Sequence, residues 1–143
     1  MAQKAAWVLS LALLATPAVQ AQQQAAVESK GQHSVLKMEQ VISGHLTELN
    51  GRYKLRVAES IFEPGGYIGM HHHAGPGLRC VISGDLTYIH PDKTTVYHPG
   101  DCFYESGDIA HGTRNDGKEA LHLLVFEILP ADLKKSSIMP VPK

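Results

Sequence analysis

Three histidines in this chain have the types and spacing to hold one transition metal. His71 and His73 are two residues apart, so on a β-strand their side chains share one face and His72 takes the other. His111 falls in a second strand-like segment and would approach from a neighbouring strand. Imidazole suits Zn, Fe, Ni, Cu and, with oxygen ligands, Mn. The pattern therefore predicts one divalent transition metal (Fe, Mn, Zn, Ni or Cu) inside a β-structure.

The segments that must position these histidines have the texture of β-strands. From residue 35 onward, apolar or β-branched runs alternate with turn sequences such as Asn50-Gly51 and Pro64-Gly65-Gly66. The runs predict strands near residues 35–42, 53–62, 66–73, 78–83, 85–90, 94–98, 102–105, 110–114 and 120–128. Short strands spaced by about ten residues are typical of a sandwich or jelly-roll barrel. We therefore expect an all-β, single-domain jelly-roll β-barrel.

The N-terminus has the composition of a secretory signal peptide. Lys4 precedes an apolar stretch from Ala5 to Ala15, and small residues follow up to Ala21. This stretch is shorter than the about 20 residues of a membrane span, although an uncleaved anchor is an open alternative. Cleavage would give an exported protein, periplasmic or secreted. The expected organisation is a signal peptide over 1–21, a flexible mature N-terminus over 22–34, the barrel over 35–130 and a C-terminal tail over 131–143.

Charge and cysteine content limit the kinds of binding partner and the cellular compartment that we expect for this chain. With 13 basic and 14 acidic residues, the chain shows no cationic patch for nucleic acid or an anionic membrane. We expect a small-molecule ligand or substrate, no nucleic acid, and no membrane after signal cleavage. Cys80 and Cys102 fall in predicted strands. They could form a disulfide in an oxidising compartment, act as separate small hydrophobes, or supply a thiolate to the metal.

The histidine pair lies in a pattern that resembles the first motif of the cupin family. That motif is Gly-(x)5-His-x-His-(x)3–4-Glu-(x)6-Gly. It aligns here with Gly65, His71, His73, Gly77 and Gly84. The resemblance implies a jelly-roll barrel in which both histidines bind a metal. The family's usual glutamate ligand is replaced by Gly77.

The second cupin motif, Gly-(x)5-Pro-x-Gly-(x)2-His-(x)3-Asn, has a counterpart further along the chain. It aligns with Gly100, Ser106, Asp108, His111 and Asn115. Ser106 stands for the proline and Asp108 for the glycine, but Ser-Gly-Asp is still a turn sequence. The resemblance implies that His111 is the third metal ligand.

The missing glutamate leaves three alternatives for the centre. A metal on three histidines keeps two or three positions open for water, substrate or O₂. Alternatively, Glu105 replaces the missing ligand, because it ends the strand that turns back toward His111. In the third alternative the barrel holds no metal and only binds a ligand.

Strand alternation predicts which other side chains share the cavity. Tyr67 lies on the same face as His71 and His73 if alternation is regular. Arg79 would point inward on the next strand, where it needs Glu105 or an anionic substrate as a partner. Tyr67 and Arg79 are therefore predicted substrate-binding residues.

The last long strand supplies the remaining candidates. His122 and Phe126 share one face, and we assign that face to the interior because Glu127 lies on the other. Phe126 is then a predicted substrate-binding residue. Glu105 and His122 are the predicted catalytic groups that move protons, if burial tunes their pKa.

The resemblance specifies a fold more narrowly than a reaction, because one fold hosts many chemistries. Cupins include dioxygenases, isomerases, decarboxylases, lyases and binding proteins. A three-histidine metal with open positions favours a dioxygenase-like enzyme acting on a small oxygenated molecule. The alternatives are a non-catalytic ligand-binding or sensing module and a non-redox isomerase or lyase. Cupins also resemble one another in pairing through edge strands, which predicts a homodimer.

Overall fold

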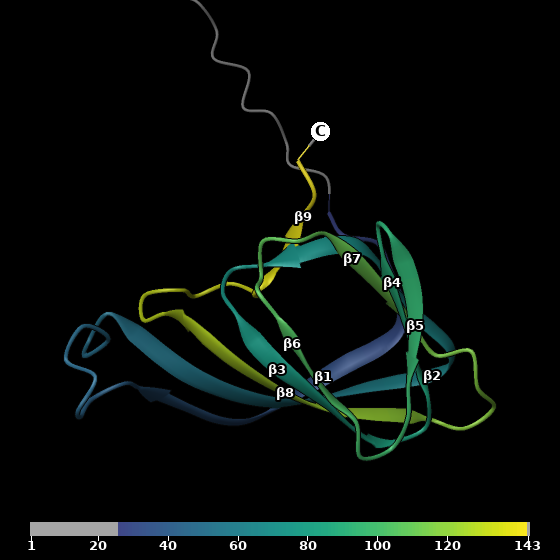
Figure 1. Ribbon diagram of the computed structural model, residues 1–143, viewed down its shortest axis with the longest axis horizontal. Coiled ribbons are helices and arrows are strands. Elements are labelled where there is room, and N and C mark those ends of the chain that lie inside the picture. Colours follow the sequence, from purple (N-terminus) through teal and green to yellow (C-terminus); the bar gives the residue numbers. More distant parts are fainter. Residues whose placement is uncertain (1–25, 143) are drawn as a thin grey trace, which may run out of the picture.

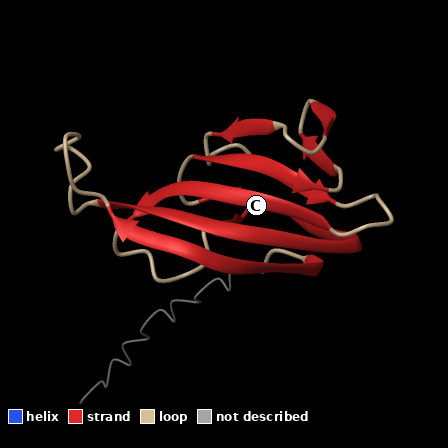
Figure 2. Ribbon diagram, turned by 90° about the horizontal axis from the view of Figure 1, so that it is seen from below, coloured by secondary structure: helices blue, strands red, loops and turns tan. Residues whose placement is uncertain are grey.

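A computed structural model describes residues 26–142, and the predicted signal peptide lies outside these residues. The described part consists of strands and loops (Figure 2). It contains no helix long and apolar enough to cross a membrane. The strands are β1 (Ser29–Val41), β2 (Tyr53–His73), β3 (Gly77–Ser83), β4 (Leu86–His90), β5 (Lys93–Tyr97), β6 (Cys102–Glu105), β7 (His111–Arg114), β8 (Leu121–Pro130) and β9 (Ile138–Pro140).

The strands are arranged around a central axis as a nearly closed antiparallel barrel (Figure 1). Their hydrogen-bonded order is β5-β4-β7-β2-β8-β3-β6, with β1 and β9 also paired to β2. The core inside the barrel is formed by Phe62, Ile68, Val81, Leu86, Leu121 and Leu123. The predicted all-β jelly-roll architecture is confirmed.

β2 is one long strand where the sequence predicts two. β8 pairs with its first half, β7 and β9 pair with its second half, and β1 pairs with residues on both sides of the bend between them. Gly65 has a φ of 72°, a conformation that glycine adopts without steric cost. A Cβ on Gly66 would lie 2.5 Å from a backbone oxygen of β1. The Pro64-Gly65-Gly66 segment is therefore a bend inside β2, and it leads the strand to the side of the barrel where the histidines lie.

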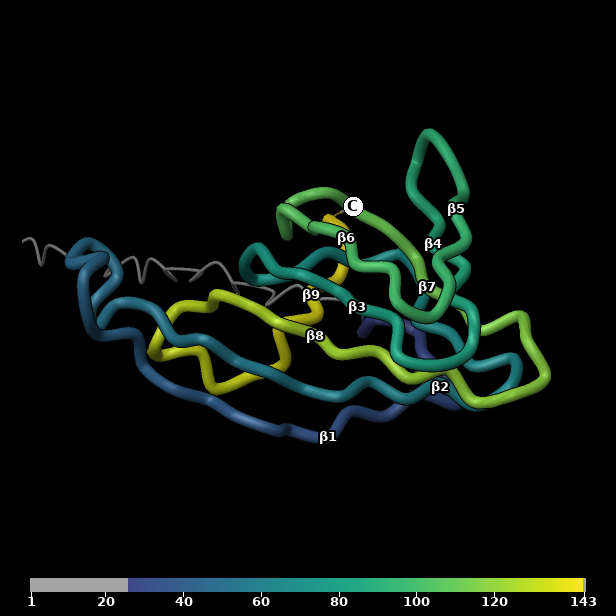
Figure 3. The backbone as a smooth tube through the Cα atoms, turned by 60° about the horizontal axis from the view of Figure 1, so that its bottom comes forward, coloured from purple at the N-terminus to yellow at the C-terminus, as the bar shows by residue number. Residues whose placement is uncertain are grey.

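Both predicted irregular segments contain strands. The mature N-terminus was expected to be flexible to residue 34, but β1 begins at Ser29 and the Gln32 amide donates to the Ser60 hydroxyl at 2.7 Å. The C-terminal tail contains β9, which pairs with His71–His73. Figure 3 shows β1 along the lower edge of the molecule. The polar composition of residues 29–34 and the prolines of the tail do not indicate strands, because the order of both segments comes from pairing with β2.

Cys80 and Cys102 form a disulfide. They lie directly opposite each other on β3 and β6. This pairing decides among the three alternatives that the sequence leaves open, since neither sulfur is free to bind a metal.

Candidate metal centre

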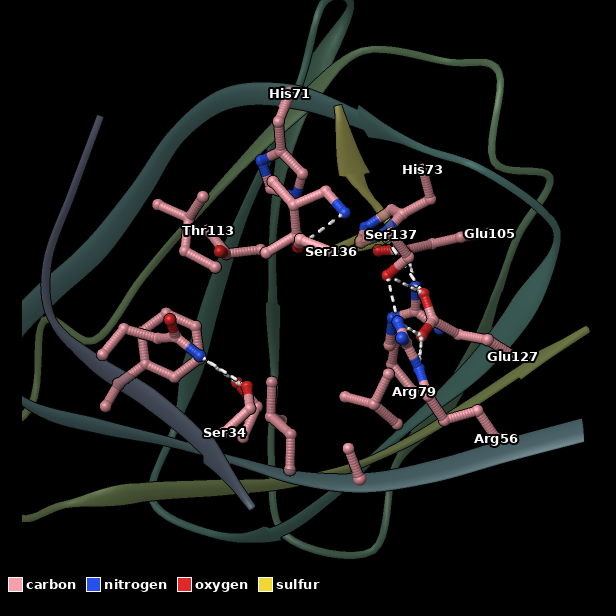
Figure 4. A pocket seen from close by; sticks show the side chains of 18 of the residues that line it. Ser34, Arg56, His71, His73, Arg79, Glu105, Thr113, Glu127, Ser136 and Ser137 are labelled. Atoms are coloured by element: carbon pink, nitrogen blue, oxygen red, sulfur yellow. Dashed lines mark hydrogen bonds and ion pairs between the residues drawn. The ribbon is translucent and has the colours of Figure 1, made fainter. Parts of the chain in front are cut away.

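The three histidines converge inside the barrel. His71 and His73 come from β2 and His111 from β7, and their ligand atoms all lie within 4.8 Å of one another. His71 is the direct cross-strand partner of His111. Both of these residues are only 1% exposed. Figure 4 shows His71 and His73 pointing into the cavity from the same strand. The described residues therefore form a cluster that could hold a metal ion.

Each imidazole is oriented by a contact on its Nδ1 side. The Nδ1 atoms of His71 and His111 lie 2.8 and 3.1 Å from the carbonyl oxygen two residues earlier, where they can donate. His73 Nδ1 lies 3.3 Å from Glu127 Oε1. A proton held on Nδ1 leaves the lone pair on Nε2, which is the usual second-shell arrangement of metal-binding histidines. The Nε2 atoms are thus the available ligands.

Burial keeps two of the imidazoles neutral. Removal from water lowers the pKa of His71 to about 3 and that of His111 to about 4, although the carbonyl bonds oppose the shift. A metal ligand must be unprotonated. Both rings are therefore ready to bind a metal at neutral pH without losing a proton.

These lowered pKa values predict that the metal-free protein loses stability in mild acid. Below pH 6.5 the unfolded chain protonates His71 and His111, whereas the folded chain does not until about pH 4 or 3. The free energy of unfolding should therefore fall as the pH drops from 6.5 toward 4, with up to about one extra proton per histidine taken up on unfolding. Urea unfolding with a chelator present checks this, and a His71→Phe variant should show a shallower slope. A flat profile in that window would be incompatible with these neutral buried rings.

Glu105 brings a carboxylate to the three imidazoles. Its Oε1 lies 3.2 Å from His111 Nε2, and its Oε2 lies 3.4 Å from His73 Nε2. Two ligands about 2.0–2.2 Å from one ion are separated by about 3.0–3.5 Å in common geometries, so this spacing fits a shared metal. His111 Nε2 is buried without a hydrogen-bond partner among the described residues. The donor atoms therefore fit a metal, and the ligand role of Glu105 stays a prediction.

Arg79 occupies the space next to position 77, where the cupin motif has its glutamate. A Cβ on Gly77 would lie 2.5 Å from Arg79 Nη1 and 2.1 Å from the Phe126 carbonyl oxygen. Gly77 is also the direct cross-strand partner of Glu105. The chain thus offers a carboxylate to the same centre from β6 instead of β3.

The expected inward direction of Arg79 is confirmed. The residue is 4% exposed, and its Nη2 lies 2.6 Å from Glu105 Oε2. The guanidinium also lies 3.5 Å from Glu127 Oε1. Two carboxylates therefore balance its buried charge, as a buried cation requires. A role of Arg79 in substrate binding stays a prediction.

Glu127 is a buried member of this network, although the sequence analysis places it on the outer face. Its carboxylate accepts hydrogen bonds from Arg56 at 2.8 Å and Ser137 at 2.7 Å. Burial acts to raise the pKa of Glu127, but His73, the charge of Arg79 and the two hydrogen bonds outweigh it and lower the pKa to about 2. The carboxylate is therefore ionised and supports the outer nitrogen of His73.

The predicted inner face of β8 was wrong. Leu123, Val125 and Glu127 line the cavity, whereas His122 and Phe126 do not. His122 instead places its Nδ1 2.8 Å from Glu59 Oε1. Side chains do alternate along β8 as predicted, but Glu127 was assumed to face solvent because it is charged. Charged side chains are rarely buried unless they are paired, and Arg56, Arg79 and Ser137 supply the partners of Glu127.

Tyr67 also lies outside the cavity. The pairing of β2 with β7 shifts register between Ile68 and His71, and such a bulge interrupts the alternation of side chains. Ile68 therefore joins His71 on the inner face. The Tyr67 hydroxyl instead contacts Glu28 near the surface. The predicted substrate role of Tyr67 is not supported by this position.

The histidines open into a cavity of about 300 Å³. This is near the lower end of the range for small-molecule sites. Polar groups line two sides of the cavity: Figure 4 shows Arg79, Glu105 and Glu127 beside His73, with Ser34 across the cavity. The apolar wall includes Leu36, Ala58, Phe62, Ile68, Leu86, Phe103, Leu123, Val125 and Ile138. The site therefore suits a small, largely apolar molecule with an oxygen group directed at the histidines.

Two further residues hold the structure around the centre in place but offer it no ligand atom. The Tyr88 ring stacks on His111 with centroids 4.8 Å apart, and burial raises its pKa, so it is a neutral phenol. Asn115, the last residue of the second motif, is fully buried. Its amide donates to the carbonyl oxygens of Phe62, Glu63 and Glu119. Asn115 therefore ties the loop after β7 to β2, which explains an asparagine at this place.

The fold and the buried histidine cluster define a class, the small jelly-roll barrels with a candidate metal site inside. Residues 58–127 match the family model Cupin_2, described as a cupin domain. Residues 58–127 therefore match a cupin domain, and the barrel has the cupin jelly-roll fold.

Solved structures show the same fold. The chain resembles the polyketide cyclase RemF from Streptomyces resistomycificus with a TM-score of 0.58 and 17% identity, over 90% of this chain and 87% of that one. For a cupin domain from Bordetella pertussis the values are 0.51 and 20%, over 72% and 98%. For KdgF from Halomonas sp. they are 0.53 and 15%, over 70% and 84%. No curated protein sequence matches the chain. At these identities the likeness concerns the fold alone.

Proposed function

We propose that this protein is an exported, metal-dependent cupin enzyme of dioxygenase-like type that acts on a small oxygenated organic molecule. The observation that carries the proposal is the convergence of three imidazoles and the Glu105 carboxylate at one end of an apolar-walled cavity. His71, His73 and His111 would hold the metal through Nε2, and Glu105 would be the fourth ligand. A divalent metal bound there supplies Lewis-acid or redox chemistry to an oxygen group of the substrate.

The residues of the chain also determine what enters the site. Apolar walls exclude bulk water and favour the hydrocarbon part of a substrate. Arg79 balances the charge of Glu105, and Glu127 holds the outer nitrogen of His73. Since His122 lies outside the cavity, Glu105 is the remaining predicted group for moving a proton near the substrate.

Metal content and oxygen uptake test this proposal. We expect purified protein to contain about one divalent transition metal per chain, and metal-loaded protein to consume O₂ with a catecholic or enolic substrate. Protein treated with a chelator should lose this uptake and recover it with one metal. A chain that binds no metal, or one that binds metal but consumes no O₂ across such substrates, would contradict the dioxygenase assignment.

A non-redox isomerase or lyase is the second candidate, because imidazole and carboxylate ligands also suit Zn, Ni and Mn. The observation in its favour is the buried Glu105, whose Oε1 lies 3.2 Å from His111 Nε2 and which could move a proton of a substrate held at the histidines. Product formation without O₂ consumption would distinguish this candidate from the first.

A homodimer is part of the same proposal. Within residues 26–142, β1 has β2 as its one strand partner, and its apolar residues Val35, Leu36, Met38 and Val41 are exposed. A long apolar edge strand is usually covered in a native protein. A second copy would cover it and close the side of the cavity that Leu36 lines. We expect light scattering to give twice the mass of the mature chain, whereas a monomer at micromolar concentration would contradict this expectation.

A further inference from the structure

β6 carries Glu105 and is an edge strand of the barrel. The strand has four residues, stands at the end of the hydrogen-bonded order and pairs with β3. Its pairs are Glu105 with Gly77, Tyr104 with Leu78, Phe103 with Arg79 and Cys102 with Cys80. A short strand with one partner depends on that ladder for its register.

The register of β6 decides where the Glu105 carboxylate points. Side chains alternate along a strand, so a shift by one residue would turn Glu105 out of the barrel. At the Glu105 end, the partner Gly77 has no side chain and gives the ladder little cross-strand contact. His73 N donates to Gly107 O at 2.7 Å and restrains the loop beyond Glu105, but that contact lies outside the ladder.

The Cys80–Cys102 disulfide fixes the opposite end of the same ladder. It joins the two strands three residues before Glu105, on the outer face of the barrel, where Cys102 is exposed. The sulfur atoms do not line the cavity. Any effect of this bond on the metal centre must therefore be transmitted through the backbone of β3 and β6.

We propose that the Cys80–Cys102 disulfide is a positioning bond for Glu105, and that it strengthens metal binding by holding β6 in register. The inference rests on the proposed function, because it requires Glu105 to bind the metal. Outer groups that orient a ligand typically change metal affinity by about 10–100-fold. The effect of the disulfide on metal affinity should therefore depend on the Glu105 carboxylate.

A double-mutant cycle with Co²⁺ as the probe tests the proposal. The first change is Cys80→Val/Cys102→Val, because paired valines keep a favourable cross-strand contact without the covalent bond. The second change is Glu105→Gln. Breaking the disulfide should weaken Co²⁺ binding by roughly tenfold when Glu105 is present, and by less than about twofold in the Glu105→Gln background. Co²⁺ absorption bands and titration give the affinities.

Controls separate positioning from a general loss of structure. Circular dichroism must show folded protein in all four chains, and Cys80→Ser/Cys102→Ser provides a second pair if the valines disturb β3. Amide hydrogen exchange at Phe103 to Glu105 should become at least about tenfold faster without the disulfide, because local opening sets this rate. Equal losses of Co²⁺ affinity in both backgrounds, or no loss in either, would overturn the positioning role while leaving the metal site intact. Absence of Co²⁺ binding in the parent chain would overturn the proposed function itself.

Discussion

Replacing both His71 and His73 with alanine should abolish stoichiometric metal binding. The variant removes two of three converging imidazoles from one strand, leaving His111 and Glu105 with too few donors to close a site. Loss of affinity should exceed the about 10–100-fold change that follows loss of a second-shell contact. Metal analysis after dialysis and titration with Zn²⁺ or Co²⁺ measures the effect.

His72 provides a matched control within the same run of histidines. Its Nε2 contacts the Pro140 carbonyl oxygen at 3.1 Å, and it does not line the cavity. His72→Ala should therefore retain metal within a few-fold of the parent while losing one contact to β9. Equal metal loss in the two variants would show that the substitutions reduce metal binding by disturbing β2 and not by removing metal ligands.

Arg79→Leu should destabilise the metal-free protein by roughly 3–5 kcal/mol, because it leaves the buried Glu105 carboxylate without its 2.6 Å counter-charge. Glu127 is less affected, since Arg56 remains bound to it at 2.8 Å. A bound divalent metal would supply the missing positive charge. The increase in the free energy of unfolding that metal gives should therefore be larger in Arg79→Leu than in the parent. Denaturant unfolding with and without metal gives both quantities.

The Arg79→Leu/Glu105→Leu variant is the control for this second prediction. Replacing both members of a buried ion pair by apolar residues is often nearly neutral. The double variant should be more stable than Arg79→Leu alone, and metal should stabilise it least. A single variant that costs less than about 1 kcal/mol would mean that Glu105 takes up a proton or rearranges instead of remaining a buried anion.

Local patterning in the sequence was enough to predict the barrel, because β-branched runs and turn sequences recur at strand spacing. It could not predict the continuity of β2. Pro64-Gly65-Gly66 has turn composition, but pairing with β1 and β7 keeps the chain extended on both sides of the bend. β9 was missed for a related reason, since its three residues become a strand through pairing with His71–His73.

The candidate site was predictable where side-chain alternation is regular and failed where it is not. His71, His73 and Arg79 face the cavity as expected. The prediction for Tyr67 failed because a bulge between Ile68 and His71 interrupts the alternation of side chains, and no residue type in the sequence indicates that bulge. His122 and Phe126 were misplaced because Glu127 was assumed to face solvent, whereas Arg56 and Ser137 satisfy its buried charge. Whether such a charged side chain is buried depends on partners that are distant in the sequence, and local composition does not identify those partners.

The direct test of the metal centre is a crystal structure of metal-loaded protein with anomalous scattering measured at the absorption edge of the metal. We expect one ion bound by the Nε2 atoms of His71, His73 and His111 at about 2.0–2.2 Å, with one Glu105 oxygen at a similar distance. An ion on the three histidines with no Glu105 oxygen at ligand distance would contradict the fourth ligand. An ion bound elsewhere, or no ion at saturating metal, would contradict the centre itself.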